Sequence, residues 1–119
     1  MGLVSLARKA GKLARGEEMT KNAVRARRCF LVILASDAGT NTVKSICNSC
    51  LYYRVPYIIW ADKAALGRAT GSAVRAVVGI LDESFANGIQ SLPGVNLNGG
   101  GEYAETEGIR DRKRFESIE

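Results

Sequence analysis

Three short, mainly apolar runs constrain the fold of this chain more than any other feature. They cover Cys29–Ala35, Tyr57–Ala61 and Val74–Leu81. Apolar and polar residues do not alternate within them, as they would in a strand with one wet face, so each run predicts a strand buried on both faces. All three runs are much shorter than the roughly 20 apolar residues that a membrane span needs. We therefore expect no association with a membrane.

Helical patterns surround these runs. The first predicted helix has apolar residues at i, i+3, i+4 and i+7, namely Leu3, Leu6, Ala7 and Ala10. Gly11 ends it. Residues 12–15 could form a short edge strand. A second helix is predicted over 17–27, because glutamates occupy its first turn and basic residues follow, as the helix dipole prefers. Its predicted inner face consists of Thr20, Ala23 and Val24.

Two aspartates are placed where they can cap later helices. Asp62 precedes a short helix that Gly71 closes, and Asp82 precedes the last one. Helices that alternate with buried strands predict an α/β fold, a three-layer α/β/α sandwich around a small mixed sheet. We assign residues 1–92 to one domain. Residues 93–119 lack periodicity and contain three consecutive glycines, which predicts a flexible charged tail.

The positive charge is concentrated at the start of the chain. The formal net charge is +5, and residues 1–28 alone contain eight Lys or Arg against two acids. Residues 95–119 are slightly acidic, with four basic residues against six acids. Such an uneven distribution favours an anionic partner such as nucleic acid.

The three cysteines do not suggest a disulfide framework, because their number is odd. Free thiols are typical of the reducing cytoplasm. Cys47 and Cys50 form a C-x-x-C pair, but zinc normally takes four ligands, and the chain has no histidine and only one further cysteine. A redox pair should open a helix, whereas this one lies mid-helix on the apolar stripe, which favours a place in the core. Thiol-redox activity is the least favoured alternative.

Catalytic patterns are missing from the sequence. Without histidine the chain lacks the commonest general base, and it contains no G-x-S-x-G, Walker-type or G-x-G-x-x-G loop. We therefore expect no enzyme activity, no metal and no cofactor.

The second predicted helix combines two kinds of polar residue on one surface. Lys21, Arg25 and Arg28 share one face at i, i+4 and i+7, and Glu18 and Asn22 lie on an overlapping face. Cations can bind phosphates, while Glu and Asn can hydrogen-bond to base edges. The alternative is a solvated helix face stabilised by Glu18–Lys21 and Glu18–Asn22 pairs. The residues alone leave both interpretations open.

Short segments in a characteristic order resemble a known family. They are Leu6–Leu13, Gly16–Glu18, Leu31–Ala38, Asn41–Thr42, Val55–Pro56, Leu66–Gly71 and Phe85–Ala86. In this order and spacing the chain resembles the L7Ae family of ribosomal and kink-turn RNA-binding proteins, in particular its small bacterial YlxQ-like branch. The resemblance covers about Leu3 to Ile89 and implies the α/β/α sandwich of the ribosomal L30e type.

The resemblance also implies a binding site. The family binds kinked RNA at tandem sheared G·A pairs through the start of the second helix and a loop after an L-G-x-A-x-G segment. The family's Asn-Glu-x-x-Lys signature falls on Glu18, Met19 and Asn22, and all three differ from it. The loop corresponds to Ser72, Ala73 and Val74.

The first hypothesis is a non-catalytic, monomeric and cytoplasmic RNA-binding protein, associated with the ribosome and recognising kinked or structured RNA. The predicted RNA-binding residues are Lys12, Arg15, Gly16, Glu17, Glu18, Met19, Lys21, Asn22, Arg25, Arg28, Ser72, Ala73 and Val74. The second hypothesis is a protein–protein interaction module of the same fold with only non-specific affinity for RNA.

Overall fold

A computed structural model describes residues 2–92 of the chain. The predicted flexible tail, residues 93–119, lies outside the described residues. The elements follow in the order α1 (Gly2–Lys9), β1 (Leu13–Arg15), α2 (Glu17–Arg25), β2 (Leu31–Leu34), α3 (Thr40–Tyr53), β3 (Tyr57–Ile59), α4 (Lys63–Thr70), β4 (Val77–Ile80) and α5 (Glu83–Gln90). This alternation confirms the predicted α/β class.

The four strands form one mixed sheet in the order β1-β4-β2-β3. β2 pairs in parallel with β3 and antiparallel with β4, and β4 pairs antiparallel with β1. The two central strands are fully buried, as their unbroken apolar sequence predicts. β3 lies at an edge, and its Ile59 is 48% exposed. The prediction that the run Tyr57–Ala61 is a strand buried on both faces is therefore wrong for the end of β3.

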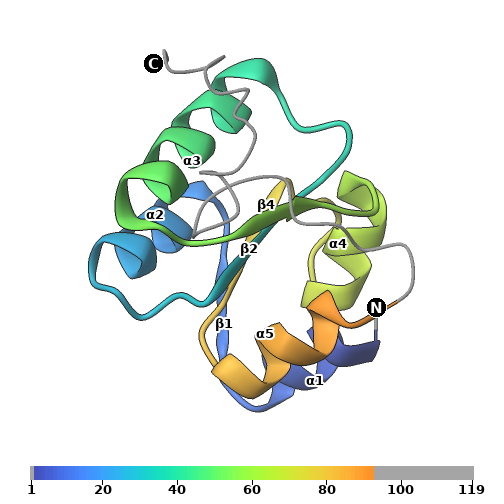
Figure 1. Cartoon of the computed structure of the whole chain (residues 1–119). Helices are drawn as coiled ribbons and strands as arrows, with labels where there is room; N and C mark the ends of the chain where they lie inside the picture. Colours follow the sequence, from blue (N-terminus) through green and yellow to red (C-terminus); the bar gives the residue numbers. More distant parts are fainter. Residues whose placement is uncertain (1, 93–119) are drawn as a thin grey trace.

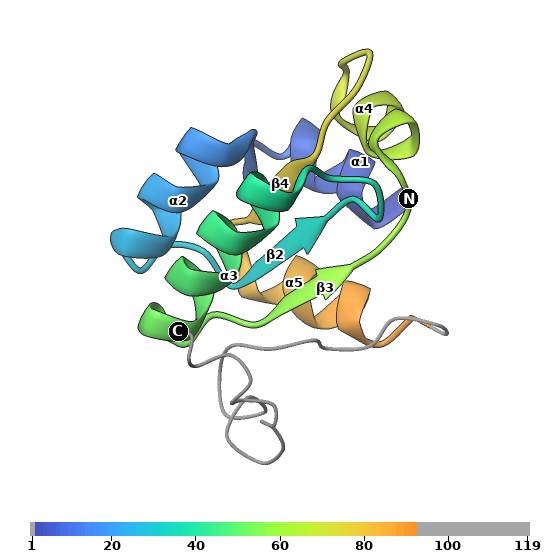
Figure 2. The same ribbon diagram turned by 90° about the horizontal axis from the view of Figure 1, so that it is seen from above.

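Helices cover both faces of the sheet, which gives the three layers visible in Figures 1 and 2. α2 and α3 lie on one face, and α1, α4 and α5 lie on the other. β2 supplies both cores because successive side chains of a strand point to opposite faces. Leu31 and Ile33 pack with α1, α4 and α5, whereas Val32 and Leu34 pack with α2 and α3.

Asp62 and Asp82 cap their helices as predicted. The carboxylate of Asp62 accepts a hydrogen bond from the amide of Ala65 at 2.8 Å, and that of Asp82 accepts one from the amide of Phe85 at 3.1 Å. Both bonds satisfy amides that the first turn of a helix leaves without an internal partner. Among residues 2–92, every helix is too short or too polar to cross a bilayer.

Four helices end in the same hydrogen-bonded turn, in which one residue adopts the left-handed conformation. The amide of the following residue donates to a carbonyl five residues back. These bonds join Lys12 to Ala7, Arg28 to Ala23, Val55 to Cys50 and Ser72 to Gly67, at 2.7–2.9 Å. The left-handed residue is Gly11 after α1 and Gly71 after α4, but it is Arg27 after α2 and Arg54 after α3.

Local departures from prediction have packing causes. In α1 the buried residues are Val4 and Ala7, while Leu6, predicted to be on the inner stripe, is 52% exposed. Apolar residues occupy both sides of this short helix, so contact with the other helices of its layer decides which side faces inward. Likewise the run that begins at Val74 becomes a strand only at Val77, because the residues before it form the loop after α4.

Candidate nucleic-acid interface

The N-terminus of α2 carries no side-chain cap. Gly16 stands at the cap position with φ +93°, a conformation that favours glycine, and its amide donates to the carbonyl of Val77 at 2.9 Å. This bond anchors the start of the helix to β4. The amides of the first turn lack side-chain partners, so they are available to a ligand.

The loop between α4 and β4 lies against this helix start. A Cβ added to Gly16 would lie 3.2 Å from Nη1 of Arg75, so the guanidinium lies beside the glycine. The Nε of Arg75 is buried, and it has no hydrogen-bond partner among the described residues. The loop is itself held tightly by α4, since a Cβ on Gly67 would lie 2.7 Å from backbone atoms of Ala73 and Val74. The tertiary structure thus joins two segments that are distant in sequence.

Two further arginines lie at the same place. Nη1 of Arg15 donates to the carbonyl of Thr70 at 3.3 Å, which connects the end of β1 to the end of α4. Nη1 of Arg8 is so close to Gly71 that a Cβ there would lie 2.6 Å away. We call the surface formed by residues 15–19 and 71–75, together with Arg8, the glycine corner.

Sequence reasoning missed Arg8 and Arg75 as parts of the site. The one available signal for Arg75 was its charge inside an otherwise apolar run. Arg8 gave no signal, because a basic residue near the end of a helix is common on dipole grounds alone. Only the contact of α1 with the end of α4 brings it to the corner.

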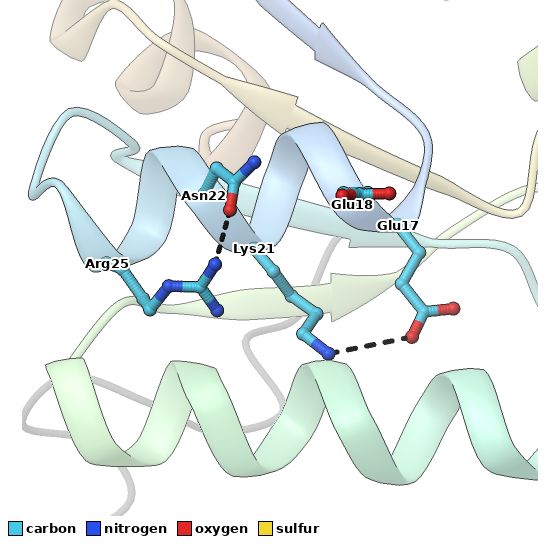
Figure 3. A pocket seen from close by; sticks show the side chains of 5 residues that line it. All are labelled: Glu17, Glu18, Lys21, Asn22 and Arg25. Atoms are coloured by element: carbon cyan, nitrogen blue, oxygen red, sulfur yellow. Dashed lines mark hydrogen bonds and ion pairs between the residues drawn. The ribbon is translucent and has the colours of Figure 1, made fainter.

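The outer surface of α2 forms an open depression of ≈ 380 Å³ lined by Glu17, Glu18, Lys21, Asn22 and Arg25 (Figure 3). Glu17 and Lys21 reach towards α3. Lys21 Nζ lies 3.9 Å from the carboxylate of Glu17 and donates to Oγ of Ser45 at 2.7 Å. Oγ1 of Thr42 donates to Glu17 at 3.1 Å. These two predicted RNA-binding residues therefore join the two helices.

The expected Glu18–Lys21 and Glu18–Asn22 pairs are absent from the described structure. Lys21 is tied to Glu17 and Ser45, and the side-chain oxygen of Asn22 instead accepts a hydrogen bond from Arg25. Glu18 is exposed and keeps its carboxylate unpaired among the described residues. It can therefore accept hydrogen bonds from an incoming donor. Met19, its neighbour, is 54% exposed and offers an apolar surface.

The predicted loop residues lie at the glycine corner as an exposed, internally braced turn. Oγ of Ser72 donates to the carbonyl of Val74 at 3.0 Å, and Ala73 is exposed. The side chain of Val74 is 57% exposed. Small and apolar side chains here can contact a flat ring without competing hydrogen bonds.

Five predicted residues lie outside the corner, and two of them, Lys21 and Asn22, lie midway along α2. Lys12 is at the other end of β1, where its carbonyl accepts a hydrogen bond from Leu81. Arg25 and Arg28 lie at the far end of α2, which is about 13 Å long for nine residues. The predicted set is therefore not one compact site: it extends from the glycine corner along α2 to its far end, and Lys12 lies apart from it before β1.

The thiol alternative finds no support in the geometry. Cys50 is buried in the core between α3 and the sheet, as predicted, whereas Cys47 is only half-buried at the edge of that core. Burial raises the pKa of Cys50 well above the ordinary value. Burial also raises the pKa of Cys47, and that of Cys29 to about 11. Reactive thiols need lowered pKa values. Among residues 2–92, groups of three or more His, Cys, Asp or Glu that could hold a metal are absent.

The chain is similar to bacterial proteins of known name. It is 41% identical to the RNA-binding protein YlxQ of Bacillus subtilis (strain 168) over 90 residues, which cover 76% of this chain and 90% of that protein. It is 37% identical to the RNA-binding protein YlxQ of Enterococcus faecium over 92 residues, which cover 77% of this chain and 88% of that protein.

Solved structures show the same arrangement. A Bacillus halodurans protein of unknown function superposes with a TM-score of 0.72 at 37% identity, over 75% of this chain and 90% of the other. The Giardia lamblia 15.5kD RNA binding protein superposes with a TM-score of 0.65 at 28% identity, over 71% and 73% of the two chains. The sequence model of one family matches residues 1–89, nearly all of the described part. The chain therefore belongs to the ribosomal protein L7Ae/L30e/S12e/Gadd45 family.

Proposed function

We propose that this protein is a non-catalytic RNA-binding protein that recognises a kinked stem at the glycine corner. The names of its relatives, RNA-binding protein YlxQ and a 15.5kD RNA binding protein, support RNA as the ligand. The observation that carries the proposal is the contact between Gly16 and Arg75, because it places the uncapped helix start and the α4–β4 loop on one surface.

The acidic and basic side chains at the corner bind different parts of the RNA. Glu17 and Glu18 lie in the first turn of α2, and their negative charges would repel a phosphate placed directly at the helix end. Glu18 instead accepts hydrogen bonds from the amino and imino groups of a guanine edge. The phosphates bind to the arginines around it, which supply the salt-dependent part of the affinity: Arg8, Arg15 and Arg75.

The loop supplies a different kind of contact. In a kinked RNA one or more bases leave the stack, and their faces are free to pack on a protein surface. The exposed side chains of Met19 and Val74 provide such a surface on the two sides of the corner. We propose that the protein acts in this way as a cytoplasmic monomer on ribosomal or other structured RNA.

A second function is favoured by the same two side chains. Exposed apolar residues beside unpaired polar groups also suit a protein partner. In that case Met19 and Val74 would be the contacts that matter, and RNA affinity would be weak and non-specific.

Binding of a kink-turn RNA and a straight duplex of equal length, measured over a salt series, tests the proposal. The wild type is compared with a Glu18→Ala/Asn22→Ala double variant and with Arg75→Gln. We expect wild type to prefer the kinked RNA at all salt concentrations. The double variant should lose the preference, because it lacks the base-reading groups, while Arg75→Gln should bind both RNAs more weakly and with a shallower salt dependence.

Lys44→Ala is the matched control, because Lys44 is an exposed cation of α3 that contributes nothing to the corner. It should leave the preference unchanged. Equal, steeply salt-dependent binding of wild type to both RNAs would contradict the proposal and favour the protein-interaction alternative.

A further inference from the structure

Two tyrosines and an arginine gather at the end of the α2–α3 layer opposite the glycine corner. The ring of Tyr52 is in edge-to-face contact with that of Tyr53, with centroids 4.8 Å apart and an interplanar angle of 77°. The guanidinium of Arg27 lies over the Tyr53 ring, 5.6 Å from its centroid. The side chain of Tyr52 is 78% exposed. We call Arg27, Tyr52 and Tyr53 the tyrosine platform.

The two segments that form the platform carry one sign of charge at this end. The sequence has no carboxylate between Met19 and Ser36, nor between Ala38 and Ala61. Of the six cations in these two segments, Arg25, Arg27, Arg28 and Arg54 lie at the platform end. Lys21 and Lys44 lie towards the starts of α2 and α3, where Lys21 pairs with Glu17. Arg25 and Arg28 flank Arg27 and are exposed. An anionic partner is therefore favoured at this end.

Arg27 is not the residue that its backbone prefers. Its φ is +59°, in the left-handed region, where glycine is favoured because a Cβ is crowded there. The turns that end α1 and α4 use glycine at the equivalent place. Retaining arginine here puts the guanidinium over Tyr53. The side chain therefore has a use that the turn alone does not explain.

We propose that the tyrosine platform is a stacking site for an unpaired nucleotide of the RNA strand that leaves the stem held at the glycine corner. Bases stack on exposed aromatic rings, and guanidinium groups supplement them by stacking and by binding the neighbouring phosphate. Arg25, beside the platform, also lines the depression on α2 that reaches Glu17 and Glu18 of the glycine corner. Because α2 is about 13 Å long, a strand of a few nucleotides spans the distance.

The chemistry of the platform distinguishes RNA from a protein partner. An acidic peptide would use the cations but would leave the open face of Tyr52 without a specific partner. A nucleotide uses both, since every base has a flat face and every linkage a negative charge. The inference rests on the proposed function in one respect only, namely that the RNA stem binds at the glycine corner.

Three kinds of RNA probe test the site. They are a blunt kink-turn RNA, two extended forms of it with five single-stranded uridines at the 5′ or at the 3′ end, and free decauridylate. For wild type we expect one extension to strengthen binding over the blunt RNA. Tyr52→Ala should weaken binding of the extended RNA about tenfold and leave the blunt RNA unchanged. Tyr52→Phe, which keeps the ring, should retain the affinity, and 5-bromouridine in the extension should crosslink to Tyr52.

A second pair of variants separates binding from stability. Arg27→Gly and Arg27→Ala both remove the guanidinium, but only glycine is relaxed at φ +59°. We expect both to weaken extended-RNA binding equally while Arg27→Gly melts at the higher temperature. If binding instead follows the melting temperature, Arg27 acts only on the fold and the site is overturned.

The outcomes for the two sites are distinguishable. Tyr52-dependent binding of decauridylate without binding of the kink-turn RNA would leave the platform standing and overturn the corner. No gain from either extension, with Tyr52→Ala equal to wild type on all three probes, would overturn the platform, whether or not a protein binds there instead.

Discussion

The two ends of the α2–α3 layer are built from the same helices but present opposite surfaces. At the glycine corner, carboxylates and arginines stand close together around a helix start that glycine makes accessible. At the tyrosine platform, two helices end side by side in arginine, with aromatic rings between them and no carboxylate in the segments that form them. A mixed surface suits selective hydrogen bonding, whereas a cationic and aromatic one suits stacking without sequence preference.

The difference shows that backbone conformation and side-chain chemistry are separable. Gly16 and Gly71 have positive φ values where the guanidinium of an arginine from another segment lies within contact distance, so an added side chain would have to displace it. Arg27 and Arg54 have similar φ values where the structure leaves room for long side chains. Glycine at positive φ therefore lies beside another segment at Gly16 and Gly71 but in open space at Gly11, and arginine in this conformation lies on the surface.

The largest expected effect comes from Gly67→Ala, which should break the glycine corner alone. The added Cβ would lie 2.7 Å from backbone atoms of Ala73 and Val74, which cannot move like a flexible side chain. Overpacking of this kind should reduce the free energy of unfolding by about 2–3 kcal/mol. Urea denaturation measures this loss.

The same variant should lose the preference for kinked RNA and keep its affinity for decauridylate. Gly88→Ala in α5 is the control, because its nearest contact is the flexible end of Leu3. Equal losses on both RNAs would mean that the two ends do not act separately.

Gly16→Ala should have the next largest effect. Alanine at φ +93° is strained, and we expect a loss of about 1–2 kcal/mol in the free energy of unfolding. Gly39→Ala is a matched control at the start of α3, because Gly39 has φ −66° and nothing within 4 Å of an added Cβ. A comparable loss for both variants in thermal unfolding would refute the conformational explanation.

At the tyrosine platform a glycine substitution should be the more stable one, whereas at the glycine corner replacing glycine lowers the stability. Arg27→Gly should be more stable than Arg27→Ala by about 1 kcal/mol, because both lack the guanidinium and only alanine keeps the left-handed penalty. Melting curves of the two variants at equal protein concentration decide this. An alanine variant as stable as the glycine variant would remove the argument that arginine is retained against backbone preference.

The smallest effect is expected where α2 and α3 are joined beside the glycine corner. Glu17→Gln keeps an acceptor for Thr42 but removes the charge beside Lys21, so the free energy of unfolding should fall by only about 0.5 kcal/mol. The loss should disappear in high salt, because the pair is partly exposed. A large, salt-independent loss in urea denaturation would contradict this account of the contact as a weak, partly exposed ion pair.

Periodicity and turn chemistry predicted the fold closely because they act locally. The buried runs became β2 and β4, and Asp62, Asp82 and Gly71 cap or end their helices as expected. Leu6 and Ile59 were misplaced, since the face of a short helix and the edge of a sheet depend on neighbours distant in the chain. The pattern around residues 17–27 identified the helix but not its end at Arg25, which the turn at Arg27 sets.

The sequence by itself determined which segments are helices and strands, where the cations are concentrated and that Cys50 belongs to the core, because these depend on near neighbours and on hydrophobicity. Only the tertiary structure decided which of the cations lie together. It placed Arg75 beside Gly16 and Arg8 beside Gly71, tied Lys21 to α3, and moved Lys12 and Arg28 away from the corner. Such contacts are made by residues far apart in the chain, and the packing of helices on the sheet brings these residues together. A local sequence pattern does not contain this information.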